Sequence, residues 1–131
     1  MDPAQIRDFA ERYTAAWCSG EPVRVAEFFA PDGSLQVNDG ASAVGRPAIA
    51  EVARGFMTAF PDLRVSLDDV QFQDPRRAIY CWTLDGTQSG TGRRVRVSGF
   101  EEWVLGADGL IAASLGHFDE ASYRRQLEHG D

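Results

Sequence analysis

The alternation of apolar and polar residues between Arg94 and Leu105 predicts a long strand with two different faces, because successive side chains of a strand point to opposite sides. One face carries Val95, Val97, Gly99, Glu101 and Trp103, and the other carries Arg94, Arg96, Ser98, Phe100 and Glu102. Glu101 therefore falls on the apolar face. An ionised carboxylate is costly in an apolar setting unless a partner or water reaches it. The pattern indicates a buried cavity with chemistry in it, or else a different register for the strand.

The rest of the chain reads as helices followed by strands. Asp2 and Pro3 are typical of a helix start, and an apolar stripe at helical spacing predicts a helix that Gly20 ends. Further helices are predicted over 22–29 and 47–60, with a turn over 30–33 and a short strand over 34–38 between them. Strands are predicted over 63–72, 78–88, 93–105 and 110–118, followed by a short C-terminal helix that Asp119 caps.

This order predicts a single α+β domain over residues 1–131. Three N-terminal helices would pack on a strongly curved, mostly antiparallel sheet and enclose a cone. The length of 131 residues, the hydrophobic fraction of 44% and the charged fraction of 25% are ordinary for one such domain.

Charge and residue usage exclude several classes of function. The net charge of -7 argues against nucleic acid or an anionic membrane as a partner, since both attract basic surfaces. The chain contains no lysine, which excludes Schiff-base chemistry on a lysine amine and attachment of pyridoxal phosphate. No His, Cys, Asp and Glu residues have metal-ligand spacing, so neither a metal nor a cofactor is expected.

The expected location is the cytoplasm. No stretch approaches the roughly 18 apolar residues of a membrane span, and no secretory signal is visible at the N-terminus. Cys18 and Cys81 are expected to stay unbridged in a reducing compartment. The arginine and alanine bias is typical of a GC-rich bacterial source.

Several local strings, in this order of elements, resemble the SnoaL-like group of the nuclear-transport-factor-2-like superfamily, which includes polyketide cyclases and ketosteroid isomerases. The strings are Ala59-Phe60-Pro61-Asp62-Leu63, the Trp82 strand leading to Gly86-Thr87, Asp108-Gly109-Leu110-Ile111, and Phe118-Asp119. The resemblance implies a cone-shaped α+β barrel and a homodimer that forms through the outer face of the sheet. It implies no single activity, because one fold hosts many functions.

The resemblance to ketosteroid isomerases implies candidate catalytic residues. Their oxyanion hole combines a tyrosine on the first helix with a neutral carboxylic acid on a late strand. Tyr13 and Glu101 fall at these two positions. The aspartate base of the isomerases has no equivalent, since Val37 occupies its place and Asn38 or Asp39 approaches it only if the loop is rearranged. His117 has the same parity as Ile111, Ala113 and Leu115 in the last strand, which is expected to place it at the rim of the cavity, and it is the other candidate base.

Each candidate also has a structural interpretation. Glu101 can be a solvated carboxylate at a dimer face, and Tyr13 shares an apolar stripe with core residues. A buried tyrosine needs a hydrogen-bond partner, and a bond between Tyr13 and Glu101 would satisfy both groups. His117 can be a hydrogen-bonded structural histidine. The residues expected to line the cone are Trp17, Phe56, Phe60, Trp82, Trp103 and Ala113, which can equally be core.

Two functions remain open on the sequence. The first is a cofactor-free enzyme that binds a small apolar carbonyl or cyclic compound and catalyses isomerisation, cyclisation or dehydration by proton transfer. The second is a non-catalytic small-molecule-binding or accessory homodimer of the same fold. The carboxylate on an apolar face favours the first, and the missing base favours the second.

Overall fold

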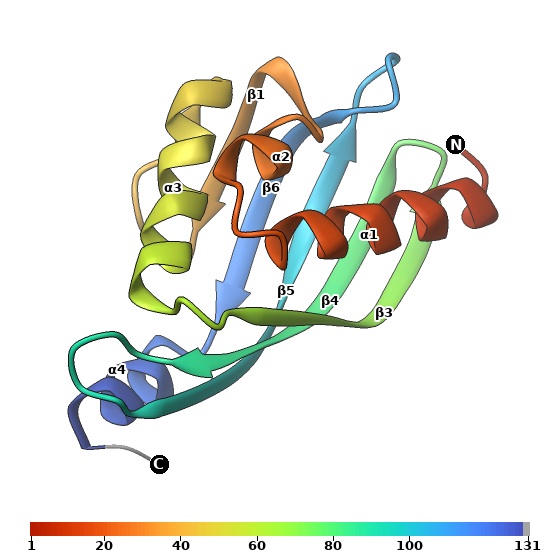
Figure 1. Ribbon diagram of the computed structural model, residues 1–131. Coiled ribbons are helices and arrows are strands. Elements are labelled where there is room, and N and C mark those ends of the chain that lie inside the picture. The colour runs from red at the N-terminus through yellow and green to blue at the C-terminus, as the bar shows by residue number, and fades with distance from the viewer. Residues whose placement is uncertain (130–131) are drawn as a thin grey trace.

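A computed structural model describes residues 1–129, which form helices on a curved six-stranded sheet (Figure 1). The helices are α1 (Pro3–Trp17), α2 (Pro22–Ala26), α3 (Arg46–Ala59) and α4 (Glu120–His129). The strands are β1 (Phe29–Val37), β2 (Ala43–Val44), β3 (Arg64–Asp74), β4 (Arg77–Thr87), β5 (Arg94–Leu105) and β6 (Ile111–Phe118). Their order in the sheet is β2-β1-β6-β5-β4-β3, with β1 and β6 parallel and the other neighbours antiparallel. The predicted α+β class is confirmed.

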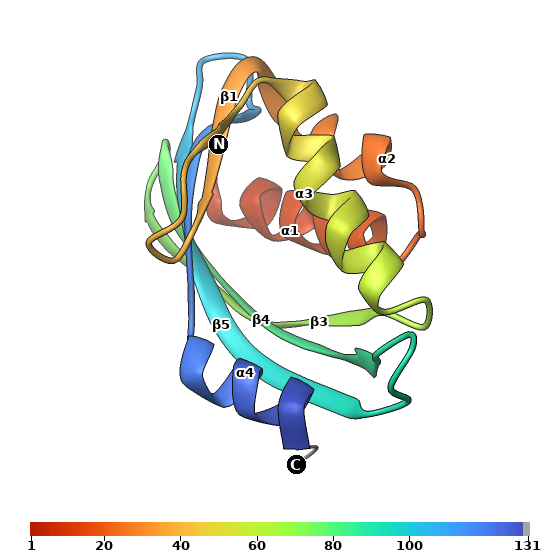
Figure 2. The same ribbon diagram turned by 90° about the vertical axis from the view of Figure 1, so that its left-hand side faces the viewer.

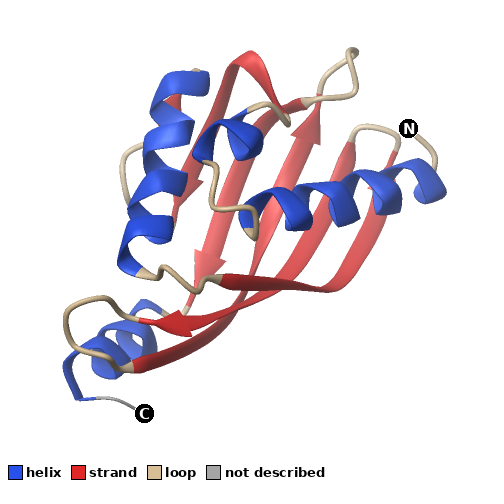
Figure 3. Cartoon of the chain, viewed as in Figure 1, coloured by secondary structure: helices blue, strands red, loops and turns tan. Residues whose placement is uncertain are grey.

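The helices and the sheet enclose the predicted cone. Helices α1 and α3 lie on the concave side of the sheet, with α2 beside them (Figures 1 and 2). The sheet curls most strongly at the end where β4 and β5 run past α4 (Figure 2). Figure 3 shows the same two layers coloured by secondary structure. None of the helices in residues 1–129 is long and apolar enough to cross a membrane.

The first helix begins where the sequence predicts. The backbone N–H of Gln5 donates to the Asp2 carboxylate at 2.8 Å, and the Asp2 N–H donates to the Gln5 side chain at 2.9 Å. This reciprocal pair satisfies two backbone donors that a helix start leaves open. The stripe that α1 buries comprises Ile6, Phe9, Ala10, Tyr13, Ala16 and Trp17. Tyr13 therefore points from α1 into the space between the helices and the sheet.

The alternation predicted for the long strand is present in β5. Val95, Val97, Glu101 and Trp103 are buried, whereas the polar residues between them are exposed. The register across β4 and β5 runs without interruption from Arg77 opposite Val104 to Thr87 opposite Arg94. Glu101 accordingly lies on the inner face of the sheet, as predicted.

The start of β1 differs from the sequence prediction. The turn expected over 30–33 lies within the strand, and the second helix ends at Ala26, three residues before the expected Phe29. Phe29 is fully buried and pairs with Ile111 of β6, and the pairing shifts register before Ser34. A Cβ at Gly33 would lie 2.8 Å from the Ile111 carbonyl oxygen, so the glycine permits this close irregular pairing. The Pro-Asp-Gly sequence therefore makes a bulge within a strand.

Candidate functional site

The candidate site is built around Glu101, whose side chain is 7% exposed. In the sheet, Glu101 lies between Tyr80 of β4 and Gly116 of β6. A Cβ at Gly116 would come within 3.8 Å of Glu101 Cγ. Because Gly116 has no side chain, the space beside the glutamate stays open towards β6 and β1.

Three donors from three elements converge on one oxygen of Glu101. Oε1 accepts hydrogen bonds from the Tyr13 hydroxyl at 3.0 Å, the Trp103 ring nitrogen Nε1 at 2.9 Å and the Ser114 hydroxyl at 2.8 Å. The Tyr13 hydroxyl also lies 3.3 Å from Oε2, which has no other partner within residues 1–129. The carboxyl group is therefore fixed through Oε1, while Oε2 keeps unused hydrogen-bonding capacity.

The surroundings of Glu101 shift the pKa of its carboxyl group. Burial raises the pKa of Glu101 above its ordinary value, and the hydrogen bonds from Trp103, Ser114 and Tyr13 offset part of this rise. An indole nitrogen can only donate, so Oε1 must accept from Trp103 in either protonation state. A proton bound by Glu101 consequently resides on Oε2. The raised pKa makes this oxygen a better proton acceptor than the oxygen of a solvated glutamate.

Aromatic rings hold Tyr13 in position to donate. Its ring makes edge-to-face contacts with Phe28, Tyr80 and Trp103 at centroid distances of 5.6, 5.2 and 5.3 Å. Tyr80 and Trp103 stack on each other at 4.9 Å. Burial and the neighbouring Glu101 carboxylate raise the pKa of Tyr13 well above its ordinary value, so Tyr13 stays a neutral hydroxyl. The hydrogen bond between Tyr13 and Glu101 that the sequence suggested is present.

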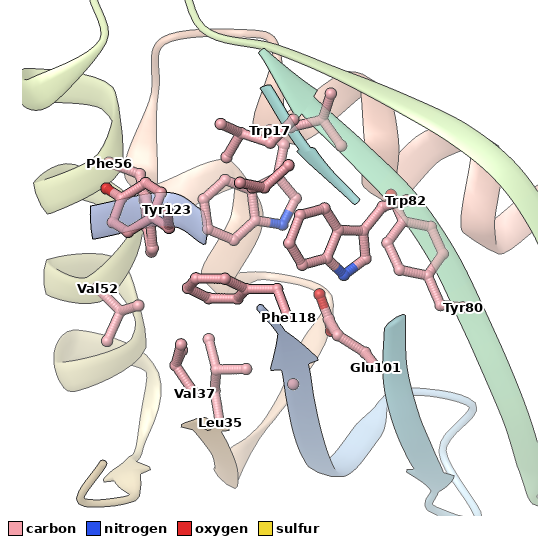
Figure 4. Close-up of a pocket in the computed structure, with 14 residues that line it drawn as sticks. Trp17, Leu35, Val37, Val52, Phe56, Tyr80, Trp82, Glu101, Phe118 and Tyr123 are labelled. Atoms are coloured by element: carbon pink, nitrogen blue, oxygen red, sulfur yellow. The ribbon is translucent and has the colours of Figure 1, made fainter. Parts of the chain in front are cut away.

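Glu101 borders a cavity between the helices and the sheet (Figure 4). The cavity has a volume of about 60 Å³. Most lining side chains are aliphatic or aromatic, and they include Val37 of β1, Val52 and Phe56 of α3, and Tyr123 of α4. Glu101 is the one carboxylate among them. A mostly apolar cavity with one carboxyl group in its wall suits a small, mostly apolar ligand.

Only some of the side chains that were expected to line the cone border the cavity. Trp17, Phe56 and Trp82 border the cavity. Phe60, Trp103 and Ala113 do not, which corrects the expectation for these three. Phe60 is fully buried in a separate cluster with Leu84, Val95 and Val97. Trp103 lies behind Glu101, and Ala113 pairs with Val104 on β5 and Ser34 on β1.

His117 lies on the outer face of the sheet and not at the rim of the cavity. Its ring stacks on Phe100 at 4.7 Å, and its Nε2 lies 2.7 Å from the Glu102 carboxylate. The register between β5 and β6 shifts between Val104 and Leu105, so residues 113, 115 and 117 face away from the side that Ile111 buries. This irregularity reverses the parity on which the expected position of His117 was based.

Asp39 also lies apart from Glu101. It is exposed in the turn after β1, whereas Val37, two residues earlier, borders the cavity. The structure thus brings Tyr13 and Glu101 together and places neither His117 nor Asp39 with them. Within residues 1–129 there is also no group of three or more His, Cys, Asp or Glu side chains that could hold a metal ion.

Two polar groups of the site escaped the sequence analysis. Ser114 supplies the shortest hydrogen bond to Glu101, and Trp82 presents a buried ring nitrogen with no partner among the described residues. Trp82 was expected only as an apolar wall. Ser114 lies two residues before Gly116, so the two residues share a face of β6. This spacing places Ser114 on the inner face only once the bulge in β6 is known.

Comparison with known proteins agrees with this architecture. The model of the SnoaL-like domain family matches residues 10–114. Among curated proteins, none matches the sequence significantly. TsrD from Streptomyces laurentii has a similar structure, with a TM-score of 0.83, 24% sequence identity, and 97% of each chain covered.

Two further solved structures share the fold at lower identity. A protein assigned as a SnoaL-like polyketide cyclase from Jannaschia Sp. CCS1 superposes with a TM-score of 0.84 and 17% identity, over 100% of this chain and 98% of that one. SalBIII, an epoxide hydrolase/cyclase-like enzyme with a role in pyran ring formation in the polyether salinomycin, superposes with a TM-score of 0.81 and 15% identity, over 92% and 95%. At these identities the similarity establishes the fold alone. Because the family model covers most of its length, the chain belongs to the SnoaL-like domain family.

Proposed function

We propose that the protein binds a small, mostly apolar carbonyl or cyclic compound in its cavity and that Glu101 exchanges a proton with this ligand. One observation carries the proposal: a buried carboxyl group that borders an apolar cavity has one oxygen held by three donors, while the other has only a 3.3 Å contact with Tyr13 among the described residues. The reaction class is isomerisation, cyclisation or dehydration by proton transfer, without a cofactor. The ring-forming role of SalBIII, a structural neighbour, supports a cyclisation chemistry for this fold.

The geometry gives Tyr13 a different role from the one that the isomerase resemblance implies. Tyr13 does not border the cavity, and its hydroxyl is directed at Glu101. Tyr13 is therefore a positioning residue, and Glu101 is the group that touches the ligand. As a base, Oε2 takes a proton from a carbon next to the ligand carbonyl, and the electron pair of the C–H bond moves to form the enolate. The same oxygen then returns the proton to the ligand at another atom.

A non-catalytic function is the second candidate, and one observation favours it. Within residues 1–129 neither His117 nor Asp39 lies beside Glu101, so proton transfer would rest on a single carboxyl group. In that case the protein binds a compound of the same class without changing it. Ligand binding is common to both candidates, and only proton exchange separates them.

We further propose that the outer face of the sheet forms a homodimer interface. Phe100, Val104 and Leu115 are exposed there by 39, 38 and 43%. They lie among polar groups that include the His117–Glu102 pair, a mixture typical of interfaces. Light scattering at micromolar concentration tests this proposal, and the 14.4 kDa mass of the monomer would contradict it.

The experiment for the main proposal uses 1-tetralone, a bicyclic ketone with exchangeable protons beside its carbonyl. Binding is followed by thermal shift, where ligand at about 100 times its dissociation constant adds roughly 2.7 kcal/mol of stability. Exchange of the protons beside the carbonyl is followed by NMR in D₂O. We expect wild type to accelerate exchange and Glu101→Gln to lose about 10²–10⁴-fold of the rate, the usual contribution of a general base.

Glu11→Gln is the matched control, because Glu11 is exposed on α1 and has no ion pair within residues 1–129. This variant should exchange protons at the wild-type rate. Binding of 1-tetralone without exchange would reject catalysis on this class of ketone and favour the accessory function. Absence of binding to 1-tetralone and to a panel of planar phenols and cyclic ketones would remove the proposal as a whole.

A further inference from the structure

The indole nitrogen of Trp82 is an unused donor in the wall of the cavity. Its Nε1 is buried and has no hydrogen-bond partner among the residues that the structure describes. Buried polar groups in native proteins are nearly always paired, and an indole N–H can only donate. Trp82 borders the cavity, so an acceptor inside the cavity can supply the partner that the protein does not.

Gly99 and Phe118 set the orientation of the Trp82 ring. Trp82 on β4 lies opposite Gly99 on β5, two residues from Glu101 on the same face. A Cβ at Gly99 would lie 2.7 Å from Trp82 Cζ2, so the glycine lets the indole lie across β5. Phe118 packs on the indole at a centroid distance of 5.9 Å with an interplanar angle of 66°. The ring is therefore held from two sides.

The free donor of Trp82 and the free oxygen of Glu101 face the same region. Figure 4 shows the nitrogen edge of the Trp82 ring turned towards the Glu101 carboxyl group. No hydrogen bond joins these two side chains, and among the described residues Oε2 has only the 3.3 Å contact with Tyr13. The two unused groups thus face one another across a mostly apolar cavity.

We infer that Trp82 Nε1 and Glu101 Oε2 bind a single ligand oxygen between them. This inference rests on the proposed function and narrows its ligand to compounds with a carbonyl or hydroxyl oxygen at the buried end. A carbonyl oxygen accepts from the Trp82 N–H and, when Oε2 is protonated, from Oε2 as well. When Oε2 is ionised, the Trp82 N–H alone holds the carbonyl oxygen, and Oε2 is free to take a proton from the neighbouring carbon. A hydroxyl oxygen accepts from the Trp82 N–H and donates its hydrogen to an ionised Oε2. In both cases Trp82 orients the ligand with its apolar part towards α3.

The test compares three compounds with one carbon skeleton: 1-tetralone, 1-tetralol and tetralin, which carry a carbonyl oxygen, a hydroxyl oxygen and no oxygen. Their dissociation constants are measured for wild type, Trp82→Phe and Trp17→Phe. Trp17→Phe is the matched control, because Trp17 also borders the cavity and undergoes the same substitution. We expect wild type to bind at least one oxygenated compound about tenfold more tightly than tetralin, as for a buried donor that gains its partner. Trp82→Phe should abolish this preference, and Trp17→Phe should keep it.

The outcomes separate the inference from the proposed function. Equal binding of all three compounds to wild type, or an unchanged preference in Trp82→Phe, overturns the oxygen site but leaves an apolar ligand pocket in place. Binding of none removes the proposed function for fused-ring ligands and the inference with it. A measurement on unmodified protein gives a second readout: the Trp82 indole proton should move downfield in NMR spectra with 1-tetralone and not with tetralin. An unmoved resonance overturns the inference even if the variants fail to fold.

Discussion

Replacing Glu101 with glutamine changes the dependence of stability on pH in a direction that the structure determines. Burial raises the pKa of Glu101 in the folded protein above its value in the unfolded chain. The folded protein therefore binds this proton more tightly than the unfolded protein does. The stability that the proton contributes is fully present below the unfolded pKa and is lost as the pH rises through the folded pKa. Glutamine keeps the shape of the side chain and has no such dependence.

The magnitude follows from the same linkage. Each unit by which the folded pKa exceeds the unfolded one costs the folded protein about 1.4 kcal/mol at pH values above both. As the pH rises from about 4.3, the pKa of an unfolded glutamate, the unfolding free energy of Glu101→Gln should therefore increase relative to that of wild type. The full increase is about 1.4 kcal/mol for each unit by which the folded pKa exceeds the unfolded one. For a domain of this size, about 1.4 kcal/mol corresponds to roughly 5 °C in the melting midpoint.

Urea denaturation at several pH values measures the effect as the difference in unfolding free energy between Glu101→Gln and wild type. Taking the difference cancels the titration of groups that the two proteins share. Glu11→Gln serves as the control, because Glu11 is exposed. The difference in unfolding free energy between this variant and wild type should not change with pH. A flat difference for Glu101→Gln, or one that favours wild type as the pH rises, would refute the claim that burial dominates over the three hydrogen bonds.

Three further substitutions test other parts of the site. Tyr13→Phe removes one of the donors to Glu101 and should cost about 1–3 kcal/mol of unfolding free energy, measured in urea. Unchanged stability would contradict a buried hydrogen bond between Tyr13 and Glu101. Gly99→Ala puts a methyl group against the His117 carbonyl oxygen and 2.7 Å from Trp82 Cζ2, and should lower stability by about 1–3 kcal/mol in thermal denaturation. Unchanged stability would contradict this close packing around Gly99. Gly116→Ala places a methyl group 3.8 Å from Glu101 Cγ and should weaken 1-tetralone binding several-fold by calorimetry, with unchanged affinity arguing against a ligand beside β6.

The sequence located Glu101 correctly because β5 is regular. In an uninterrupted strand the face of each residue follows from its parity alone, and the register between β4 and β5 has no break. The apolar stripe of α1 placed Tyr13 on the inner side for a similar local reason. The two residues then meet because the helix packs across the sheet, which the family resemblance implied.

The errors arise where pairing between distant strands decides the local structure. His117 and Ala113 were assigned to the inner face by counting from Ile111, but a register shift near the start of β6 reverses the count. The segment from Ala30 to Gly33 has the composition of a turn, yet it becomes a bulge because Phe29 pairs with Ile111. A bulge depends on the opposing strand as well as on its own residues, so the local sequence did not reveal either one.

The groups that fix the carboxyl group and the groups that shape the cavity opposite it come from different parts of the fold. Tyr13, Trp103 and Ser114 hold Oε1 from α1, β5 and β6. The apolar wall includes Val52 and Phe56 of α3, whose side chains have no polar atom that could bond to that oxygen. Substitutions in α3 can therefore change which ligands fit while the proton-carrying group keeps its setting. Under the proposed function, such independence lets natural variation or directed evolution change the range of ligands while the hydrogen bonds that hold Glu101 stay the same.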